Sequence, residues 1–95
     1  MHIIPRKALQ AFWAQHADAE SPLQRWYKIV HQSNFASLND LRQTFPSADM
    51  VDDWVVFNIG GNKYRLIASV HFNWGKVYVR HVLTHEEYDR GAWKR

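Results

Sequence analysis

A pair of glycines followed by a strongly alternating segment constrains the fold of this chain more than any other feature. The turn Gly60-Gly61-Asn62 separates two runs rich in apolar residues, Trp54–Ile59 and Lys63–Phe72. Glycine accepts the positive backbone φ angles that tight hairpin turns require. Successive side chains of a strand point to opposite faces, so the second run predicts one apolar face and one polar face. The apolar face holds Tyr64, Leu66, Ala68, Val70 and Phe72, and the other holds Lys63, Arg65, Ile67, Ser69 and His71.

Two further strands complete the predicted sheet. Lys76–Leu83 follows a second turn at Asn73-Trp74-Gly75, and His2–Ile4 ends at Pro5, which cannot donate to a ladder. Short turns between consecutive strands predict an antiparallel meander rather than a parallel α/β sheet. The residues expected to meet the helices are Val55, Phe57, Ile59, Leu66, Val70, Phe72, Val77, Val79 and Leu83.

Helical spacing occurs twice in the first half of the chain. One face is formed by Leu9, Phe12, Trp13 and His16, and another by Leu23, Trp26, Tyr27 and Val30. The second helix is expected to begin at Ser21-Pro22-Leu23-Gln24, a capping-box pattern with proline at the first helical position. The two helices should form a hairpin. Ser37 is expected to cap a shorter helix that Pro46 ends, and the acidic segment Asp49–Asp53 is expected to be a surface loop.

The C-terminal segment predicts a short last helix. Thr84-His85-Glu86-Glu87 is a capping-box pattern, and the helix should continue to about Arg90. The tail Trp93-Lys94-Arg95 is expected to fray, with contact to RNA as the alternative. The fold class is therefore α+β, with N-terminal helices on one face of a mainly antiparallel sheet and a short C-terminal helix. A length of 95 residues predicts a single domain over residues 1–95.

Several classes of protein and site are not expected. The chain has no cysteine, which excludes disulfides and thiolate metal sites. No apolar run approaches the ~20 residues of a membrane span, and the N-terminus lacks the apolar region of a signal peptide, so a cytoplasmic location without membrane contact is expected. His81 and His85 lie four apart beside Glu86, but a predicted strand–helix junction separates them, so we expect neither a metal nor a cofactor.

Charge is unevenly distributed along the chain. Residues 1–53 hold five Lys/Arg and six Asp/Glu, whereas residues 54–95 hold seven and three. The basic half is also the half rich in predicted strands. Clustered cations gain affinity for nucleic acid by releasing counterions, so this distribution favours a phosphate-bearing partner for the sheet. The alternative is a basic surface that is merely solvated.

The polar face of the sheet and the last helix contain residue types suited to cleaving RNA without a metal. His85 is the candidate for proton transfer, because both protonation states of histidine exist near neutral pH. Arg65 can hold two phosphate oxygens, and Lys63 adds a second positive charge. Tyr88 can donate a proton or stack on a base. The RNA-binding face is completed by Asn58, Asn62, His71 and Arg80.

Each of these assignments has a plainer alternative. His85 can be an exposed residue at a helix start, and Arg65 can lie on a solvated strand face. Tyr88 can pack on the core. Lys63 and Arg80, taken singly, can be surface cations.

The combined pattern VFNIGGNKYRLIASVHF and VYVRHVLTHEEYD, preceded by a short strand and a helical hairpin, resembles the HigB branch of the RelE-like bacterial toxins. The resemblance covers roughly His2 to Arg90 and is most specific over Trp54 to Asp89. It implies a toxin of a type II toxin–antitoxin pair that cleaves mRNA on the translating ribosome. It also implies a small HigA-like antitoxin with a helix-turn-helix domain. Operator DNA would then be bound only by the toxin–antitoxin complex.

The resemblance also implies roles for individual residues. In RelE-like enzymes an arginine of the YRL strand motif contacts the scissile phosphate, and Arg65 occupies the matching position. A catalytic cation follows the last strand, where this chain has His85, and Tyr88 is the nearest match to a C-terminal tyrosine. The lysine pair that precedes the arginine in RelE is absent, and Lys63 is a partial substitute.

Two other functions remain open at the level of sequence. A toxin of the same fold can act by binding alone, as the ParE branch does on DNA gyrase. An inert RNA-binding module is the second alternative. The pairing of His85 and Tyr88 beside an arginine-bearing strand favours the nuclease, because a protein that only binds has no need of a titrating group.

Overall fold

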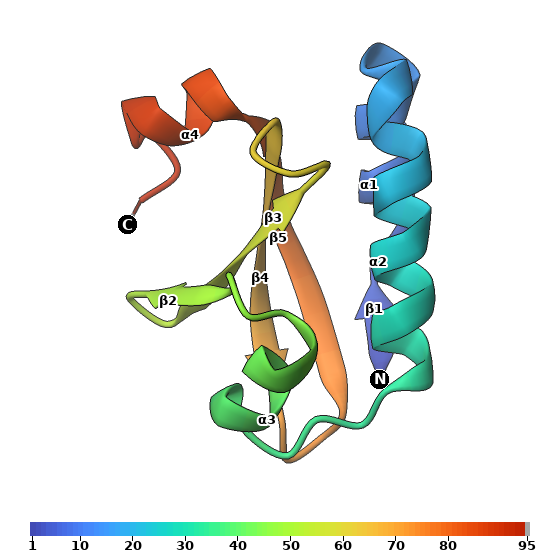
Figure 1. Cartoon of the computed structure of the whole chain (residues 1–95), viewed down its shortest axis with the longest axis vertical. Helices are drawn as coiled ribbons and strands as arrows, with labels where there is room; N and C mark the ends of the chain where they lie inside the picture. Colours follow the sequence, from blue (N-terminus) through green and yellow to red (C-terminus); the bar gives the residue numbers. More distant parts are fainter. Residues whose placement is uncertain (95) are drawn as a thin grey trace.

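One five-stranded sheet organises the computed structural model, which describes residues 1–94 (Figure 1). The strands are β1 (His2–Ile4), β2 (Asp49–Val51), β3 (Trp54–Ile59), β4 (Tyr64–His71) and β5 (Lys76–Thr84). The helices are α1 (Arg6–Gln15), the short 3₁₀ helix η1 (Ala17–Ala19), α2 (Glu20–Gln32), α3 (Leu38–Thr44) and α4 (His85–Arg90). The predicted α+β class is confirmed.

The strand order is β1-β5-β4-β3-β2, and β3, β4 and β5 form the predicted antiparallel meander. β1 pairs with β5 in parallel, with His2 opposite Lys76. The expectation of a loop over Asp49–Asp53 is wrong, because Asp49–Val51 pairs with the edge of β3. Asp52 has a φ angle of 56°, and aspartate tolerates this left-handed region well enough to close a tight turn.

Helices α1 and α2 lie side by side on one face of the sheet, as the predicted hairpin (Figure 1). The prediction that a capping box begins the second helix at Ser21 is wrong. α2 already begins at Glu20, continuing directly from η1, and Ala19 at the cap position has no side chain to bond the backbone. Gln24 instead donates to the carboxylate of Glu20 at 3.1 Å. Pro22 is tolerated because backbone amides of the first helical turn have no partner within the helix.

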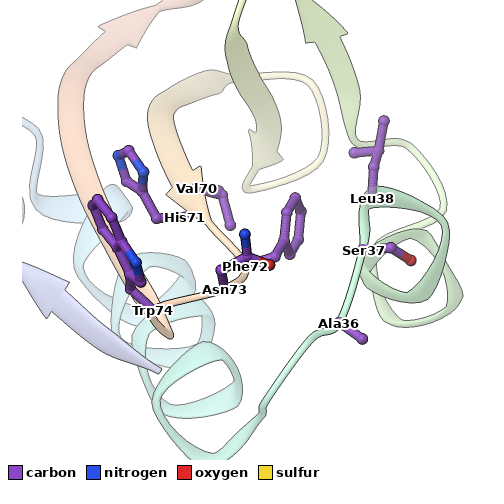
Figure 2. Close-up of a pocket in the computed structure, with 8 residues that line it drawn as sticks. All are labelled: Ala36, Ser37, Leu38, Val70, His71, Phe72, Asn73 and Trp74. Carbon is purple, nitrogen blue, oxygen red and sulfur yellow. The ribbon is translucent and has the colours of Figure 1, made fainter.

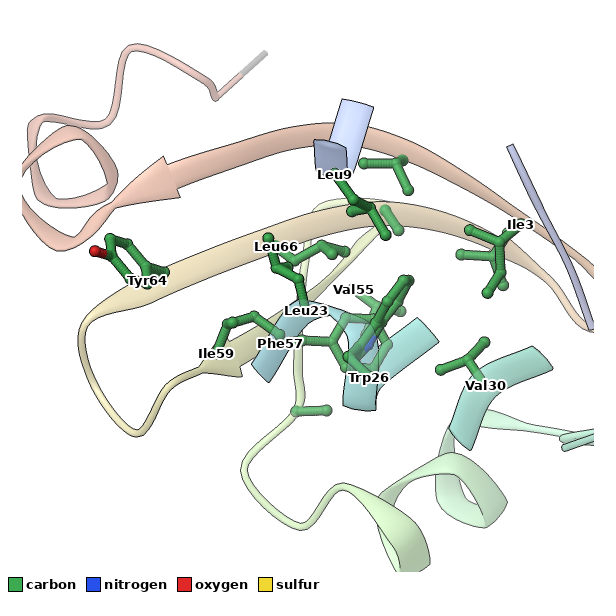
Figure 3. Close-up of a cluster of buried hydrophobic side chains, with 14 of the residues drawn as sticks. Ile3, Leu9, Leu23, Trp26, Val30, Val55, Phe57, Ile59, Tyr64 and Leu66 are labelled. Carbon is green, nitrogen blue, oxygen red and sulfur yellow. The ribbon is translucent and has the colours of Figure 1, made fainter. Parts of the chain in front are cut away.

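The main core fills the space between the helical hairpin and the sheet (Figure 3). Its fully buried side chains include Leu9, Leu23, Val30, Val55, Phe57, Leu66 and Val77. Val70 and Phe72 pack against this cluster while partly exposed, as members of the predicted apolar set. The apolar residues of β3 and the alternation of β4 therefore predicted the face that meets the helices correctly.

A β-bulge in β5 changes which residues face the helices. Ile67 pairs with His81 and Ala68 pairs with Val79, so Arg80 is the extra residue. Beyond the bulge the alternation shifts by one, and Val82 packs against the main core. The prediction that Leu83 meets the helices is wrong, because it points to the opposite face.

A smaller apolar cluster covers part of the second face of the sheet. It is built on Val56, Ile67 and Trp93, and α4 with the C-terminal segment lies on this side, away from α1 and α2 (Figure 1). Trp93 is 6% exposed, and its indole Nε1 donates to the carbonyl of Tyr88 at 2.9 Å. The expectation of a frayed tail is therefore wrong for Trp93, and Arg95 lies outside the described residues. No helix within residues 1–94 combines the length and apolarity that a bilayer span requires.

Candidate active site

Two hydrogen bonds of a capping box hold the start of helix α4 at the end of β5. Thr84 accepts a hydrogen bond from the amide of Glu87 at 3.2 Å, and the Glu87 carboxylate accepts one from the amide of Thr84 at 2.9 Å. This is the predicted capping box. The amide of Thr84 is the main cause that lowers the pKa of Glu87. Gly91, with a φ angle of 74°, ends the helix in the left-handed conformation that glycine favours.

Arg65 and Tyr88 are brought together on the second face of the sheet. The Arg65 guanidinium carbon lies 5.3 Å from the centroid of the Tyr88 ring. Its Nη1 donates to the carbonyls of Asn62 at 3.2 Å and Tyr64 at 3.1 Å. With only 9% of its surface exposed, Arg65 is not the solvated strand residue of the plainer interpretation. Within residues 1–94, these bonds leave Nε and Nη2 without a protein acceptor, so both remain for an anion.

His85 forms a pair with a residue that the sequence analysis missed. Its Nδ1 lies 3.0 Å from Oδ2 of Asp89, and both side chains are about half exposed. A histidine that donates through Nδ1 keeps Nε2 for proton exchange with a substrate. The spacing of four residues on a predicted helix was an available signal, because such residues share one face.

Lys63 does not share the orientation of Arg65. Its Nζ lies 2.8 Å from Oδ2 of Asp18 in η1, and the Tyr64 hydroxyl donates to the other oxygen of that carboxylate. The prediction that Lys63 begins the polar face of the strand is wrong, because Lys63 lies in the turn and β4 begins at Tyr64. Asp18 lies 45 residues away in sequence, and no local pattern marks it.

These contacts shift three pKa values. The hydrogen bonds from Lys63 and then Tyr64 lower the pKa of Asp18, despite partial desolvation. The same carboxylate raises the pKa of Lys63 and, together with burial, the pKa of Tyr64. Lys63 is therefore held as an ammonium group whose charge is partly balanced within the protein.

The backbone joins these two groups of residues at one end of the sheet. The His85 amide donates to the carbonyl of Lys63 at 3.0 Å, and Arg65 pairs with Leu83, two residues before His85. His85 and Lys63 line an open depression of about 440 Å³. Its other lining residues are Asp18, Tyr64, Thr84 and Glu86. Among residues 1–94, no hydrogen bond, ion pair or ring contact links the side chains of Arg65 and His85.

The four predicted RNA-binding residues lie in two separate regions of the sheet. Asn58 is exposed and pairs with Arg65 across β3 and β4, and Asn62 lies in the adjoining turn. His71 and Arg80 lie further along the sheet. His71 is six residues from Arg65 on β4, which at a rise of ~3.3 Å per residue is roughly 20 Å. The sheet therefore does not gather all four residues into one site.

Histidine and carboxylate side chains are not clustered in a metal-binding arrangement within residues 1–94. His81 instead contacts Trp54, with ring centroids 5.7 Å apart. The bulge at Arg80 places His81 on the second face of the sheet, whereas His85 lies on α4.

Comparison with known proteins places this arrangement in a family. The model of the HigB toxin family, described as the RelE-like toxic component of a toxin–antitoxin system, matches residues 19–91. The chain belongs to the HigB toxin family. As a HigB toxin it has an antitoxin as its partner. The predicted resemblance is thereby confirmed, and the matched segment contains Lys63, Arg65, His85 and Tyr88.

Curated relatives agree with the HigB assignment. The mRNA interferase toxin HigB of Escherichia coli K12 is 36% identical over 92 residues, covering 94% of this chain and 88% of the relative. The mRNA interferase HigB of Shigella flexneri has the same identity and coverage. The mRNA interferase HigB of Escherichia coli O6:H1 is 28% identical over 93 residues, covering 95% of this chain and 90% of the relative. The likeness thus extends over nearly the whole HigB chain.

Proposed function

We propose that this HigB-family toxin is a ribosome-dependent endoribonuclease that cleaves mRNA and so arrests translation and growth. The names of its relatives support RNA as the substrate. The observation that carries the proposal is the buried guanidinium of Arg65, held against Tyr88 at the same end of the sheet as the His85–Asp89 pair.

The proposed reaction is attack of a ribose 2′-oxygen on the adjacent phosphorus, with departure of the 5′-oxygen. One proton leaves the 2′-hydroxyl and one is delivered to the leaving oxygen, and His85 and Tyr88 take part in these transfers. Arg65 stabilises the extra negative charge of the phosphorane through its uncommitted N–H groups. Asp89 orients the imidazole and does not itself exchange a proton with the substrate.

The ribosome is proposed to supply alignment of the RNA. The depression beside His85 is open, and Lys63 is engaged with Asp18, so few groups hold the RNA at the scissile linkage itself. Positioning alone can provide a large part of a rate enhancement. Free RNA should therefore be cleaved weakly and mRNA in a translation extract strongly. Efficient cleavage of naked RNA at the same protein concentration would refute the dependence on ribosomes.

The proposed setting of this activity is the cytoplasm, where mRNA is translated. A HigA-like antitoxin with a helix-turn-helix domain would neutralise the toxin, and operator DNA would be bound only through that complex. Co-expression with the protein encoded by a neighbouring reading frame tests this pairing, because a HigA-like antitoxin must restore growth and co-purify with the toxin.

Primer extension on mRNA after induced expression tests the nuclease. Wild-type protein should create new 5′ ends inside reading frames, and Arg65→Ala and His85→Ala should abolish them along with growth arrest. Arg42→Ala, which removes an exposed cation from α3, is the matched control. DNA breaks with intact mRNA would support a gyrase poison of the ParE kind. Growth arrest by His85→Ala with RNA binding and no cleavage would support a passive binder.

A further inference from the structure

The turn between β4 and β5 presents an exposed tryptophan at the end of the sheet away from α4. Trp74 is 70% exposed, and among residues 1–94 the only other large exposed hydrophobic side chain is Met50, at 42%. The Trp74 indole is nevertheless ordered by a partner. It is stacked on the imidazole of His71, with ring centroids 5.3 Å apart and planes inclined by 12°. One face of the indole is therefore covered, and the other is free to stack.

A series of side chains supports this indole, and we refer to Trp74, His71, Tyr78 and Arg80 as the aromatic ladder. His71 meets the ring of Tyr78 edge to face, with centroids 5.2 Å apart. The Arg80 guanidinium carbon lies 5.6 Å from the Tyr78 centroid, and Arg80 Nε donates to the Ser69 hydroxyl at 2.9 Å. A ring fixed before binding loses little conformational entropy on contact with a ligand.

A hollow of about 480 Å³ lies between this turn and the start of α3 (Figure 2). Its lining residues are Ala36, Ser37, Leu38, Val70, His71, Phe72, Asn73 and Trp74. The hollow thus combines an aromatic wall, apolar side chains of Leu38, Val70 and Phe72, and the amide of Asn73. These are the groups that stack a nucleobase and hydrogen-bond its edge.

The charges beside the hollow favour a polyanion. Arg80 belongs to the ladder, and Lys76 is the cross-strand partner of His71. Asp40, in the first turn of α3, is an opposing negative charge near the Ala36–Leu38 wall, and its carboxylate accepts a hydrogen bond from the backbone amide of Ala36 at 2.9 Å. Residues 54–95 as a whole hold seven Lys/Arg against three Asp/Glu. An aromatic platform flanked by cations is the usual composition of a site for single-stranded nucleic acid.

We propose that the aromatic ladder and the adjoining hollow bind an unpaired base of the single-stranded RNA that this toxin cleaves, a role that rests on the proposed function. Trp74 stacks on the base, and Arg80 and Lys76 contact flanking phosphates. His71 lies on the same face of β4 as Arg65, roughly 20 Å away at ~3.3 Å per residue. The ladder is therefore a second contact, several nucleotides from the scissile linkage, that fixes the position of the strand.

Binding of a short fluorescent single-stranded oligoribonucleotide with blocked 2′-hydroxyls, followed by anisotropy, tests the proposal. Trp74→Ala should weaken binding about tenfold, because stacking on an aromatic ring contributes on the order of 1–3 kcal/mol per base. Trp74→Phe should retain most of the affinity, and Met50→Ala, the control for an exposed apolar residue, should bind like wild type. Ultraviolet irradiation should cross-link the RNA to Trp74.

Several results would overturn the proposal. These are no binding by wild type, equal binding by Trp74→Ala, or a Trp74→Ala variant that keeps RNA but loses the purified antitoxin. Cleavage of mRNA in a translation extract, measured in parallel, separates this inference from the proposed function. If wild type cleaves while Trp74→Ala binds normally, the base site fails and the nuclease stands. If the ladder binds RNA but wild type leaves mRNA intact, the nuclease fails, and the ladder is a site for single-stranded RNA that the protein does not cleave.

Discussion

Arg65 is the one charged side chain among residues 1–94 that is buried. Removing a guanidinium from water is costly unless its N–H groups and charge are compensated. Two backbone carbonyls and the face of the Tyr88 ring provide that compensation here. Burial and these contacts also fix the direction of its remaining N–H groups.

Replacing Arg65 by lysine tests whether the shape of the guanidinium matters as well as its charge. An ammonium group cannot donate to two carbonyls and still hold two phosphate oxygens in one plane. Arg65→Lys should reduce cleavage in a translation extract at least about tenfold. Arg90→Lys, in the last turn of α4, is the matched control and should remain active. An Arg65→Lys variant of wild-type activity would show that charge alone suffices.

Asp89→Asn tests the orientation of His85. The amide can still occupy the same space but accepts from Nδ1 less strongly than a carboxylate. We expect kcat to fall about tenfold with KM nearly unchanged, because in the proposed mechanism Asp89 acts only through His85. The free energy of unfolding should change by less than about 0.5 kcal/mol, since the pair is half exposed. Glu20→Gln, which removes an acid from α2, is the control. An equal loss of kcat in this variant would indicate a general effect of charge.

At the scale of elements, the six-residue helix α4 is too short to be stable by itself and depends on its ends and its packing. The capping box holds its first turn, Gly91 closes its last, and Trp93 stacks on Tyr88 with ring centroids 5.1 Å apart. The candidate proton-transfer residues therefore derive their positions from this cap.

Thr84→Ala should destabilise the protein by about 1 kcal/mol, the usual cost of losing a side-chain cap. Cleavage should fall as well, because the helix that carries His85 and Tyr88 would fray. Urea unfolding and cleavage assays on the same preparation measure both effects. Thr84→Ser keeps the hydroxyl and should retain both stability and cleavage. A Thr84→Ala variant indistinguishable from wild type would refute the role of the cap.

At the scale of the whole molecule, Asp18 links the helical hairpin to the end of the sheet that carries the candidate site. It bonds both Lys63 and Tyr64 across more than 40 residues of sequence. The two cations near the site therefore differ: Arg65 is buried in the sheet, and Lys63 is held by a carboxylate of the hairpin.

The contribution of Asp18 to stability should depend on pH. Folding lowers its pKa below the ordinary value of 3.8, so the stabilisation is present at neutral pH and is lost as pH falls through the lowered pKa. Folding raises the pKa values of Lys63 and Tyr64. The contribution of these two groups to stability is therefore present below about pH 10 and is lost as pH rises through the raised pKa values.

Urea unfolding of wild type and Asp18→Asn across pH measures this dependence. Wild type should be more stable near pH 7, and the difference should shrink below pH 3.8. Glu20→Gln removes a nearby acid that does not contact Lys63 and is the control. A difference between wild type and Asp18→Asn that stays constant from neutral to acidic pH would contradict the assignment.

Much of the architecture follows from signals between near neighbours in the sequence. The apolar content of Trp54–Ile59 and the alternation in the strand after it predicted two strands and their buried face, and the glycine turn between them set the antiparallel pairing. Thr84 and Glu87 predicted the start of α4, because a capping box needs residues only three apart. The combined motif over Trp54 to Asp89 predicted the family, which the matched segment confirms.

The sequence by itself thus determined most of the elements, the main buried face and the family, since each depends on spacings of two to four residues or on a contiguous motif. Tertiary structure alone decided that Arg80 is a bulge residue, that Trp93 covers the second face of the sheet, and that Lys63 turns to Asp18. These outcomes depend on which distant surfaces pack together. Such contacts are selected by the free energy of the whole fold and leave no periodicity in the chain.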